Sequence, residues 1–163
     1  MKNYMKLEIS ARGENEGFAR SAVAAFALPL NPSFTELSDI KTAVSEAVTN
    51  CIVHAYSKTQ DGKIIIECET EQTSTGGVLH IEIRDFGCGI EDVEQAVQPF
   101  YTTLSDDERS GMGFTIMQTF MDEFSLTSIR GEGTRVEMSR RIGEEDGAAF
   151  SKPPKSIRKV SNA

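Results

Sequence analysis

The chain has 163 residues, of which 39% are hydrophobic and 26% charged, and its formal net charge is −8. That length and composition are typical of one globular domain with a real core. The negative charge argues against a general nucleic-acid binder, because contacts to phosphates require an excess of lysine and arginine. No apolar run approaches the roughly 20 residues that cross a bilayer, and the first residues contain no apolar signal-peptide core.

The three cysteines, Cys51, Cys68 and Cys88, are odd in number, and none forms a Cys-x-x-Cys pair. Such usage suits a reducing compartment and offers no zinc site. We therefore expect an acidic cytoplasmic protein with no membrane partner and no direct nucleic-acid partner.

The first third of the chain predicts one strand and two helices. Residues Tyr4–Ala11 alternate between apolar and polar side chains, as in a half-buried strand. Asn15 is placed to cap a first helix that ends before Pro29. The predicted apolar stripe of this helix is Phe18, Ala22, Val23, Ala25 and Phe26. Ser33-Phe-Thr-Glu36 is a capping box, which predicts the start of a second helix that runs as far as Tyr56.

The second helix carries a polar ridge. Glu46, Asn50 and His54 recur every fourth residue and therefore share one helical face. The opposite face is apolar and consists of Leu37, Ile40, Val44, Ala47, Val48, Cys51 and Ala55. Because asparagine favours caps and turns over helix interiors, the amide of Asn50 indicates a functional face. A solvated face with an incidental asparagine explains this helix, taken alone, equally well.

The rest of the chain mixes strands, loops and shorter helices. Two strands, Lys63–Thr70 and Val78–Asp85, are joined by the polar loop Glu71–Gly77 and predict a hairpin. The later predicted elements are a short helix at Glu91–Gln98, a loop at Phe100–Gly113, a helix at Phe114–Phe124, and strands at Ser125–Arg130 and Thr134–Arg141. Together they predict an α/β two-layer sandwich, in which a mostly antiparallel mixed sheet carries its helices on one face.

Residues 143–163 differ in composition from the segment before them, because acidic residues are followed by prolines, lysines and an arginine. Such a segment is too polar to join a core. We therefore expect residues 1–142 to form the domain and residues 143–163 to form a flexible charged tail. Its basic residues could dock a partner, although a solubilising or inert tail is the simpler interpretation.

Asp85 ends its strand in phase with the apolar side chains of that strand. The alternation aims the carboxylate toward the buried side, where it is costly unless it accepts hydrogen bonds. Gly87 and Gly89 follow in a turn that lets the backbone approach a flat ligand closely. An exocyclic amine is a suitable donor to this carboxylate. A common Asp-Gly turn after a strand explains the same residues without a ligand.

Gly111 and Gly113 stand directly before the helix at Phe114. Glycines that open a helix expose free N–H groups at the positive end of its dipole, which is a site for phosphate. A plain helix start explains this short Gly-x-Gly equally often. The order of the features is more informative than any one of them: a ridged helix, Asp-x-Gly-x-Gly after a strand, a loop, and Gly-x-Gly before a helix.

This order of motifs resembles the Bergerat-fold (GHKL) ATPases, the group that contains DNA gyrase and the histidine kinases. Three longer segments also resemble the small serine-kinase anti-sigma factors of endospore-forming bacteria. They are Lys41-Thr-Ala-Val-Ser-Glu-Ala-Val-Thr-Asn50, Gln98-Pro-Phe-Tyr-Thr-Thr103 and Glu108-Arg-Ser-Gly-Met-Gly-Phe114. Cys51 and Cys88 depart from the family pattern, which has small or apolar residues at these positions, but no chemical group is lost.

The resemblance implies a role for each motif residue. Asn50 would ligate a magnesium ion on the phosphates of ATP, and Glu46 would be the general base on a serine hydroxyl. Asp85 would accept from the adenine amine, with Gly87 and Gly89 admitting the base. The other residues implied in nucleotide binding are Thr102, Thr103 and Ser105 in a lid, Gly111, Met112 and Gly113 at the phosphates, and Thr134 beside the adenine. The expected cofactors are ATP or ADP and Mg²⁺, an ion that needs few protein ligands.

The same resemblance implies an anti-sigma factor that is also a protein serine kinase. It would hold an RNA polymerase sigma factor of the sporulation (sigma F) type inactive, and would phosphorylate a serine of an anti-anti-sigma protein. The family further implies a homodimer, with Arg20, which should point outward from the first helix, and Arg109 as partner contacts. Ordinary surface arginines explain both equally well. Two alternatives stay open: a stress-response kinase of the sigma B type, and a non-catalytic adaptor whose binding to the sigma factor is controlled by nucleotide.

Overall fold

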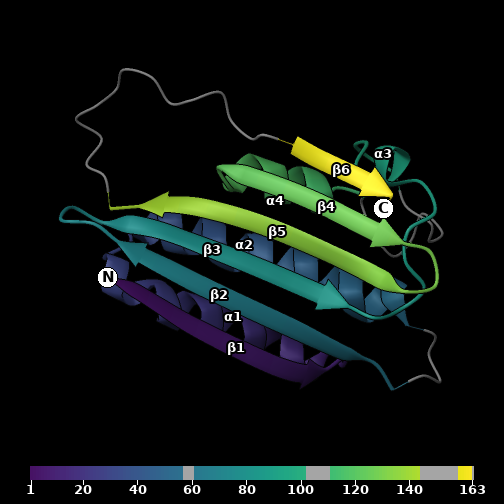
Figure 1. The fold of residues 1–163 in the computed structure, drawn as a ribbon, viewed down its shortest axis with the longest axis horizontal. Helices are drawn as coiled ribbons and strands as arrows, with labels where there is room; N and C mark the ends of the chain where they lie inside the picture. Colours follow the sequence, from purple (N-terminus) through teal and green to yellow (C-terminus); the bar gives the residue numbers. More distant parts are fainter. Residues whose placement is uncertain (57–60, 102–110, 144–157, 163) are drawn as a thin grey trace.

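The computed structural model describes residues 1–56, 61–101, 111–143 and 158–162, which form a six-stranded sheet and its helices. In spatial order the strands are β1 (Lys2–Ser10), β2 (Lys63–Gln72), β3 (Gly77–Asp85), β5 (Gly133–Ile142), β4 (Glu123–Ile129) and β6 (Arg158–Asn162) (Figure 1). Neighbouring strands are antiparallel except β4 and β6, which run parallel. The helices are α1 (Glu14–Ala27), α2 (Phe34–Asn50), α3 (Val93–Ala96) and α4 (Gly113–Phe120), with short turns η1 (Leu28–Leu30) and η2 (Cys51–Ala55).

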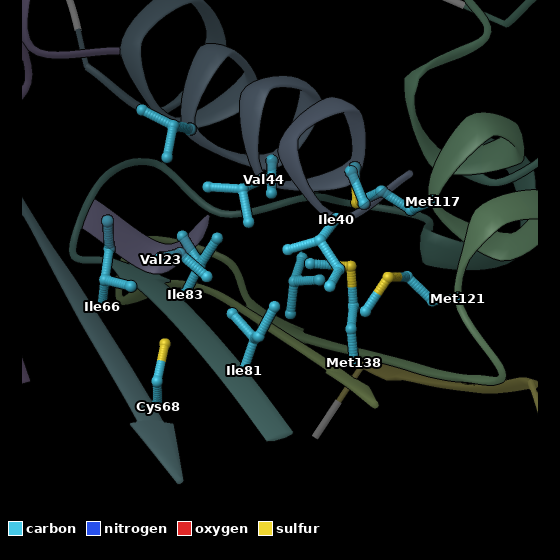
Figure 2. Packing of buried hydrophobic residues seen from close by; sticks show 14 of the residues in the cluster. Val23, Ile40, Val44, Ile66, Cys68, Ile81, Ile83, Met117, Met121 and Met138 are labelled. Atoms are coloured by element: carbon cyan, nitrogen blue, oxygen red, sulfur yellow. The ribbon is translucent and has the colours of Figure 1, made fainter. Parts of the chain in front are cut away.

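Helices α1, α2 and α4 lie on one face of the sheet, and the hydrophobic core fills the space between the two layers (Figure 1). Figure 2 shows Ile40 and Val44 of α2 facing Ile83 of β3, with Met117 of α4 and Met138 of β5 beside them. Burying an aliphatic side chain of this size contributes about 1.5–3 kcal/mol. The arrangement confirms the predicted two-layer sandwich. Among the described helices, none combines the length and the apolar character that a bilayer crossing demands.

Helix α2 begins where the sequence predicts. The Ser33 N–H donates to Glu36 Oε2 at 2.7 Å, and the Glu36 N–H donates to Ser33 Oγ at 3.2 Å, so the capping box is complete. The helix buries Ile40, Val44 and Val48 against the sheet. At its end the chain continues as the wider π-helical turn η2, a feature that often marks functional sites.

The hairpin of β2 and β3 is confirmed, but its ladder is longer than predicted. The two strands pair from Ile64 with Asp85 as far as Gln72 with Gly77, so the loop contains only residues 73–76. This register directs Asp85 to the helix-covered side together with the apolar residues of β3, because alternate side chains share one face.

Helix α1 differs from its prediction in both its cap and its buried face. The helix starts at Glu14, and the Asn15 side chain donates to the Ser10 carbonyl instead of capping it. The buried residues are Ala19, Val23, Ala24 and Ala27. Of the predicted stripe, Val23 is buried and Phe26 packs partly against the core, whereas Phe18 is 56% exposed. Because the helix is rich in alanine, two neighbouring faces are apolar enough to be buried. The face made of small residues is the one that packs against α2.

Helix α4 ends earlier than predicted, at Phe120, and β4 already begins at Glu123. Arg140 explains the end, since its guanidinium donates to the Phe120 carbonyl at 2.8 Å and to Asp39 Oδ2 at 3.1 Å. Phe124, assigned to the helix from the sequence, is a buried strand residue. Short apolar runs do not distinguish a helix end from a strand start. Helix α3 is likewise shorter than its predicted range, and the Asp92 side chain caps it.

Strand β6 corrects the prediction that residues 143–163 form only a flexible tail. Residues Arg158–Asn162 pair in parallel with Phe124–Ser128 of β4, and Val160 packs partly against the core. A strand at a sheet edge needs backbone partners more than apolar side chains, so a polar segment can supply it. Residues 144–157 lie outside the described part of the chain, and the tail prediction stays untested there.

Candidate functional site

A pocket of about 990 Å³ opens between the helix layer and one end of the sheet. Its lining comes from the end of α2, η2, the segment that follows β3, the start of α4 and the start of β5. The predicted site residues among its lining are Glu46, Asn50, Asp85, Gly89, Gly111, Met112, Gly113 and Thr134. Segments that are far apart in the sequence therefore meet at one cavity.

The polar ridge of α2 lies against the first residue of α4. A Cβ atom placed on Gly113 would stand 3.1 Å from Glu46 Oε2 and 3.3 Å from Asn50 Nδ2. The carboxylate and the amide therefore lie side by side at the N-terminus of α4, where the first backbone N–H groups have no partner within the helix. His54, one turn further on, also lines the pocket. This part of the cavity therefore places a helix start, where anions can bind, beside carboxylate and amide oxygens.

Asp85 also lines the cavity and is 5% exposed. Its Oδ1 accepts from the Gly87 N–H at 3.0 Å and from the Thr134 N–H at 3.2 Å. Burial raises the pKa of Asp85, while the Gly87 N–H, the Cys51 thiol and the Thr134 N–H act in the opposite direction. Since both backbone donors reach Oδ1, the carboxylate keeps capacity at Oδ2 for a further donor.

The glycines around Asp85 are required by close packing. A Cβ on Gly87 would collide with the Ala55 carbonyl, and one on Gly89, where φ is +71°, would collide with the Ile129 carbonyl. The Cys88 N–H donates to the Ala55 carbonyl at 2.8 Å. The turn after β3 is thus held against η2 beside Asp85. Gly87 shapes this turn but does not itself line the pocket.

Ser128 connects three parts of the site and was not predicted. It is 1% exposed, its Oγ accepts from the Ile90 N–H at 2.7 Å, and it lies 2.9 Å from Thr134 Oγ1. Ile90 and Thr134 both line the pocket. The signal was present in the sequence, because Ser128 is in phase with Phe124 and Leu126 on the buried face of β4.

Cys51 and Tyr56 are two further residues that sequence reasoning did not assign to the site. Burial raises the pKa of the Cys51 thiol well above its ordinary value, and the neighbouring Asp85 carboxylate raises it further. The Tyr56 hydroxyl donates to the Lys63 carbonyl at 2.6 Å and accepts from the Phe86 N–H at 2.8 Å. It thereby holds the end of β3 beside the start of β2. No sequence pattern indicates that hydrogen bond.

Of the other predicted site residues, Arg20 is described and does not line this cavity. Arg20 lies on α1, is partly exposed, and its Nη1 is 3.6 Å from Glu16 Oε1. Thr102, Thr103, Ser105 and Arg109 fall outside the described residues. Within the described part of the chain, no three His, Cys, Asp or Glu side chains gather as a metal cluster.

Comparison with known proteins identifies the family. A model described as the histidine kinase-like ATPase domain matches residues 9–140. The anti-sigma F factor of Thermoanaerobacter sp. (strain X514) is 50% identical over 143 residues, which cover 88% of this chain and 96% of that protein. The chain belongs to the anti-sigma F factor family. The anti-sigma F factor of Geobacillus kaustophilus (strain HTA426) is 49% identical over 144 residues, covering 88% of this chain and 96% of that protein.

The fold of this anti-sigma F factor family member also has a solved counterpart. The structure of the RsbU and RsbW domains of a Mycobacterium tuberculosis protein superposes with a TM-score of 0.60 at 15% identity. The match covers 87% of this chain and 33% of the other. At that identity the likeness shows the fold alone, and it agrees with the six-stranded sandwich described above.

Proposed function

We propose that the chain is an ATP-dependent protein serine kinase that also inhibits a sporulation sigma factor of the F type. It would bind that sigma factor as a cytoplasmic homodimer and would phosphorylate a serine of an anti-anti-sigma protein. The observation that carries the proposal is one pocket whose lining includes Asp85 as well as Glu46 and Asn50, which lie beside the start of α4. The names of the relatives support the sigma-factor target.

An adenine nucleotide would lie in the pocket with its base at Asp85 and its phosphates at the start of α4. The Asp85 carboxylate would accept from the adenine amine, while Thr134 and the backbone near Gly89 would border the base. The phosphates would then lie at Gly111 and Gly113, where the start of α4 offers free N–H groups and a positive dipole end. A cavity of about 990 Å³ is large enough for such a ligand.

The residues at the phosphate end also fit a magnesium ion. Mg²⁺ prefers oxygen ligands, keeps several waters and is commonly held by one or two protein groups together with phosphate oxygens. Asn50 would provide an amide oxygen beside Gly113. When bound there, the ion would neutralise charge on the phosphate oxygens.

Glu46 would act as the general base. Its carboxylate lies one helical turn before Asn50 and next to Gly113, so it borders the space that we assign to the γ-phosphate. A serine hydroxyl entering there would donate its proton to Glu46 as its oxygen attacks phosphorus, and ADP would leave. Most of the remaining catalysis is positioning, which α2 and α4 supply as rigid elements.

The proposal is tested with labelled ATP and the anti-anti-sigma protein. Glu46→Gln keeps the shape of the side chain but removes the base, so we expect phosphate transfer to fall about 10²- to 10⁴-fold while ATP affinity changes little. Glu132→Gln, the same change on an exposed turn, is the matched control. Transfer by Glu46→Gln at the parent rate would exclude Glu46 as the base.

The same assay addresses the alternatives. A parent chain that binds ATP but transfers no phosphate would be a nucleotide-gated adaptor. Pull-downs with sigma factors of the F and B types, with and without ATP, separate the sporulation target from the stress-response target. Charge reversal at Arg20 and at Arg109 tests both as partner contacts, and unchanged affinity for both partners would remove them from the interface.

A further inference from the structure

Asn162, at the end of β6, is hydrogen-bonded to the wall of the pocket. Its Oδ1 accepts from the Val93 N–H at 3.2 Å, and its Nδ2 donates to the Ile90 carbonyl at 2.8 Å and to the Ser128 carbonyl at 3.4 Å. Figure 1 shows β6 along the outer edge of β4, with α3 beside its end. One side chain near the C-terminus therefore connects β4 to the segment before and within α3.

That segment depends on contacts from outside itself. Helix α3 has four residues, too few to be stable alone. Val93 is its first residue, so its N–H has no partner within the helix, and Asn162 supplies the missing acceptor. Ile90 is held on both sides, since its N–H donates to Ser128 Oγ and its carbonyl accepts from Asn162.

The segment held in this way forms one wall of the nucleotide pocket. The lining residues it contributes are Ile90, Glu91, Asp92, Gln95 and Ala96. The family model ends at residue 140, before β6 begins. The contact between Asn162 and the wall is therefore made by a part of the chain that the family pattern does not describe.

We propose that β6 is a positioning element for nucleotide binding, and that Asn162 acts by fixing Ile90 and Val93 at the pocket wall. The proposal rests on the proposed function, because it assumes that ATP or ADP occupies this cavity. Asn162 does not line the cavity and acts through the backbone of the wall segment. By linkage, a nucleotide that contacts the wall must in turn stabilise the attachment of β6.

The experiment compares the full-length parent with Asn162→Ala and with Ser161→Ala, an exposed neighbour in the same strand. We measure ADP affinity by calorimetry, KM for ATP and kcat with the protein substrate, and amide hydrogen exchange. Asn162→Ala should weaken ADP affinity and raise KM for ATP about two- to tenfold, because a change of that size corresponds to the loss of about one net hydrogen bond. Its kcat at saturating ATP should stay within about twofold of the parent, since Glu46 and Asn50 are untouched.

Amide hydrogen exchange tests directly whether Asn162 holds the pocket wall in place. The Val93 amide should exchange faster in Asn162→Ala than in Ser161→Ala, and ADP should slow exchange in β6 of the parent. Asn162→Asp keeps an acceptor for Val93 but sets a second carboxylate oxygen against the Ile90 and Ser128 carbonyl oxygens, so its ADP affinity should fall at least as far as that of Asn162→Ala.

The outcomes that overturn the proposal are distinct. Equal ADP affinity in Asn162→Ala and Ser161→Ala would overturn it while leaving the proposed function intact, even if Asn162→Ala were less stable. An unchanged Val93 exchange rate would show that Asn162 does not hold the wall. A parent chain that bound no ADP would overturn the proposed function and this proposal together.

Discussion

At the scale of single residues, the stability of the fold and the role proposed for Asp85 make opposite demands on its carboxylate. Its carboxylate is almost fully buried, which disfavours the charged form, and burial is the main reason that its pKa is raised above the ordinary value of 3.8. Two backbone N–H groups and a buried thiol compensate only in part. A buried carboxylate costs folding free energy, but its acceptor oxygens are what a ligand donor would require.

The raised pKa of Asp85 predicts a pH dependence with a definite sign. Between pH 3.8 and the higher folded-state pKa, the folded protein binds more protons than the unfolded chain. The contribution of Asp85 to the free energy of unfolding therefore falls as pH rises through that interval. Asparagine does not titrate, and its oxygen can still accept from Gly87 and Thr134. The stability of Asp85→Asn relative to the parent should accordingly increase with pH and then level off.

Urea unfolding of the parent and Asp85→Asn at steps between about pH 4 and 7 measures this difference. Asp61→Asn, the same change at an exposed position, is the control. A difference that shrank as pH rose would mean that the pKa of Asp85 is lowered in the folded protein, contrary to the effect of its burial.

At the scale of elements, the sequence predicted best where several local signals agree. Helix α2 has a capping box, a regular apolar face and sufficient length, and all three are confirmed. The stripe of α1 was ambiguous, because its alanines fit either of two faces and only packing on α2 selects one. The junction of α4 and β4 depends on Arg140 reaching the Phe120 carbonyl, a contact between residues 20 apart. Strand β6 is polar and has no apolar alternation, so it is defined only by its pairing with the edge of β4.

The approach of α4 to α2 depends on Gly113. The φ angle of Gly113 is not in the left-handed region, so the backbone accepts alanine there. Within a helix, alanine is favoured over glycine by up to about 1 kcal/mol. Its Cβ would nevertheless press on Glu46 Oε2 and Asn50 Nδ2 at 3.1 and 3.3 Å. We expect the free energy of unfolding of Gly113→Ala to lie within about 1 kcal/mol of that of the parent. Its rate of phosphate transfer should nevertheless fall at least about tenfold, because small displacements of positioned catalytic groups are costly.

Phosphate transfer and urea unfolding, measured side by side, test this expectation. Gly13→Ala is the steric control, since a Cβ there would have no atom within 4 Å. Parent-level transfer by Gly113→Ala would mean that the ridge of α2 can shift without loss of function.

At the scale of the whole molecule, the site is a property of the topology. Glu46, Asp85, Gly113 and Thr134 are spread over 89 residues of sequence. Glu46 lies about one turn before the end of α2, and the other three lie at the end or start of a strand or helix. Residue types and their order, together with the resemblance to a known family, predicted eight of the residues that line the pocket. The alternation of β4 indicates that Ser128 is buried, but not which groups it bonds. The contacts of Ser128 and Asn162 are hydrogen bonds to backbone groups that only the folded sheet brings near.

This topology also predicts how nucleotide should affect folding. A ligand in the cavity would contact α2, the segment after β3, α4 and β5 at once, and the unfolded chain offers no such site. Binding to the folded state alone stabilises it by RT ln(1 + [L]/Kd), which is about 2.7 kcal/mol at one hundred times Kd. We expect ADP to raise the free energy of unfolding of the parent by about that amount and to have much less effect on Asp85→Asn, whose amide cannot accept from the adenine amine at Nδ2. Urea unfolding at fixed ADP concentrations measures both shifts, and equal shifts in the two proteins would place the adenine away from Asp85.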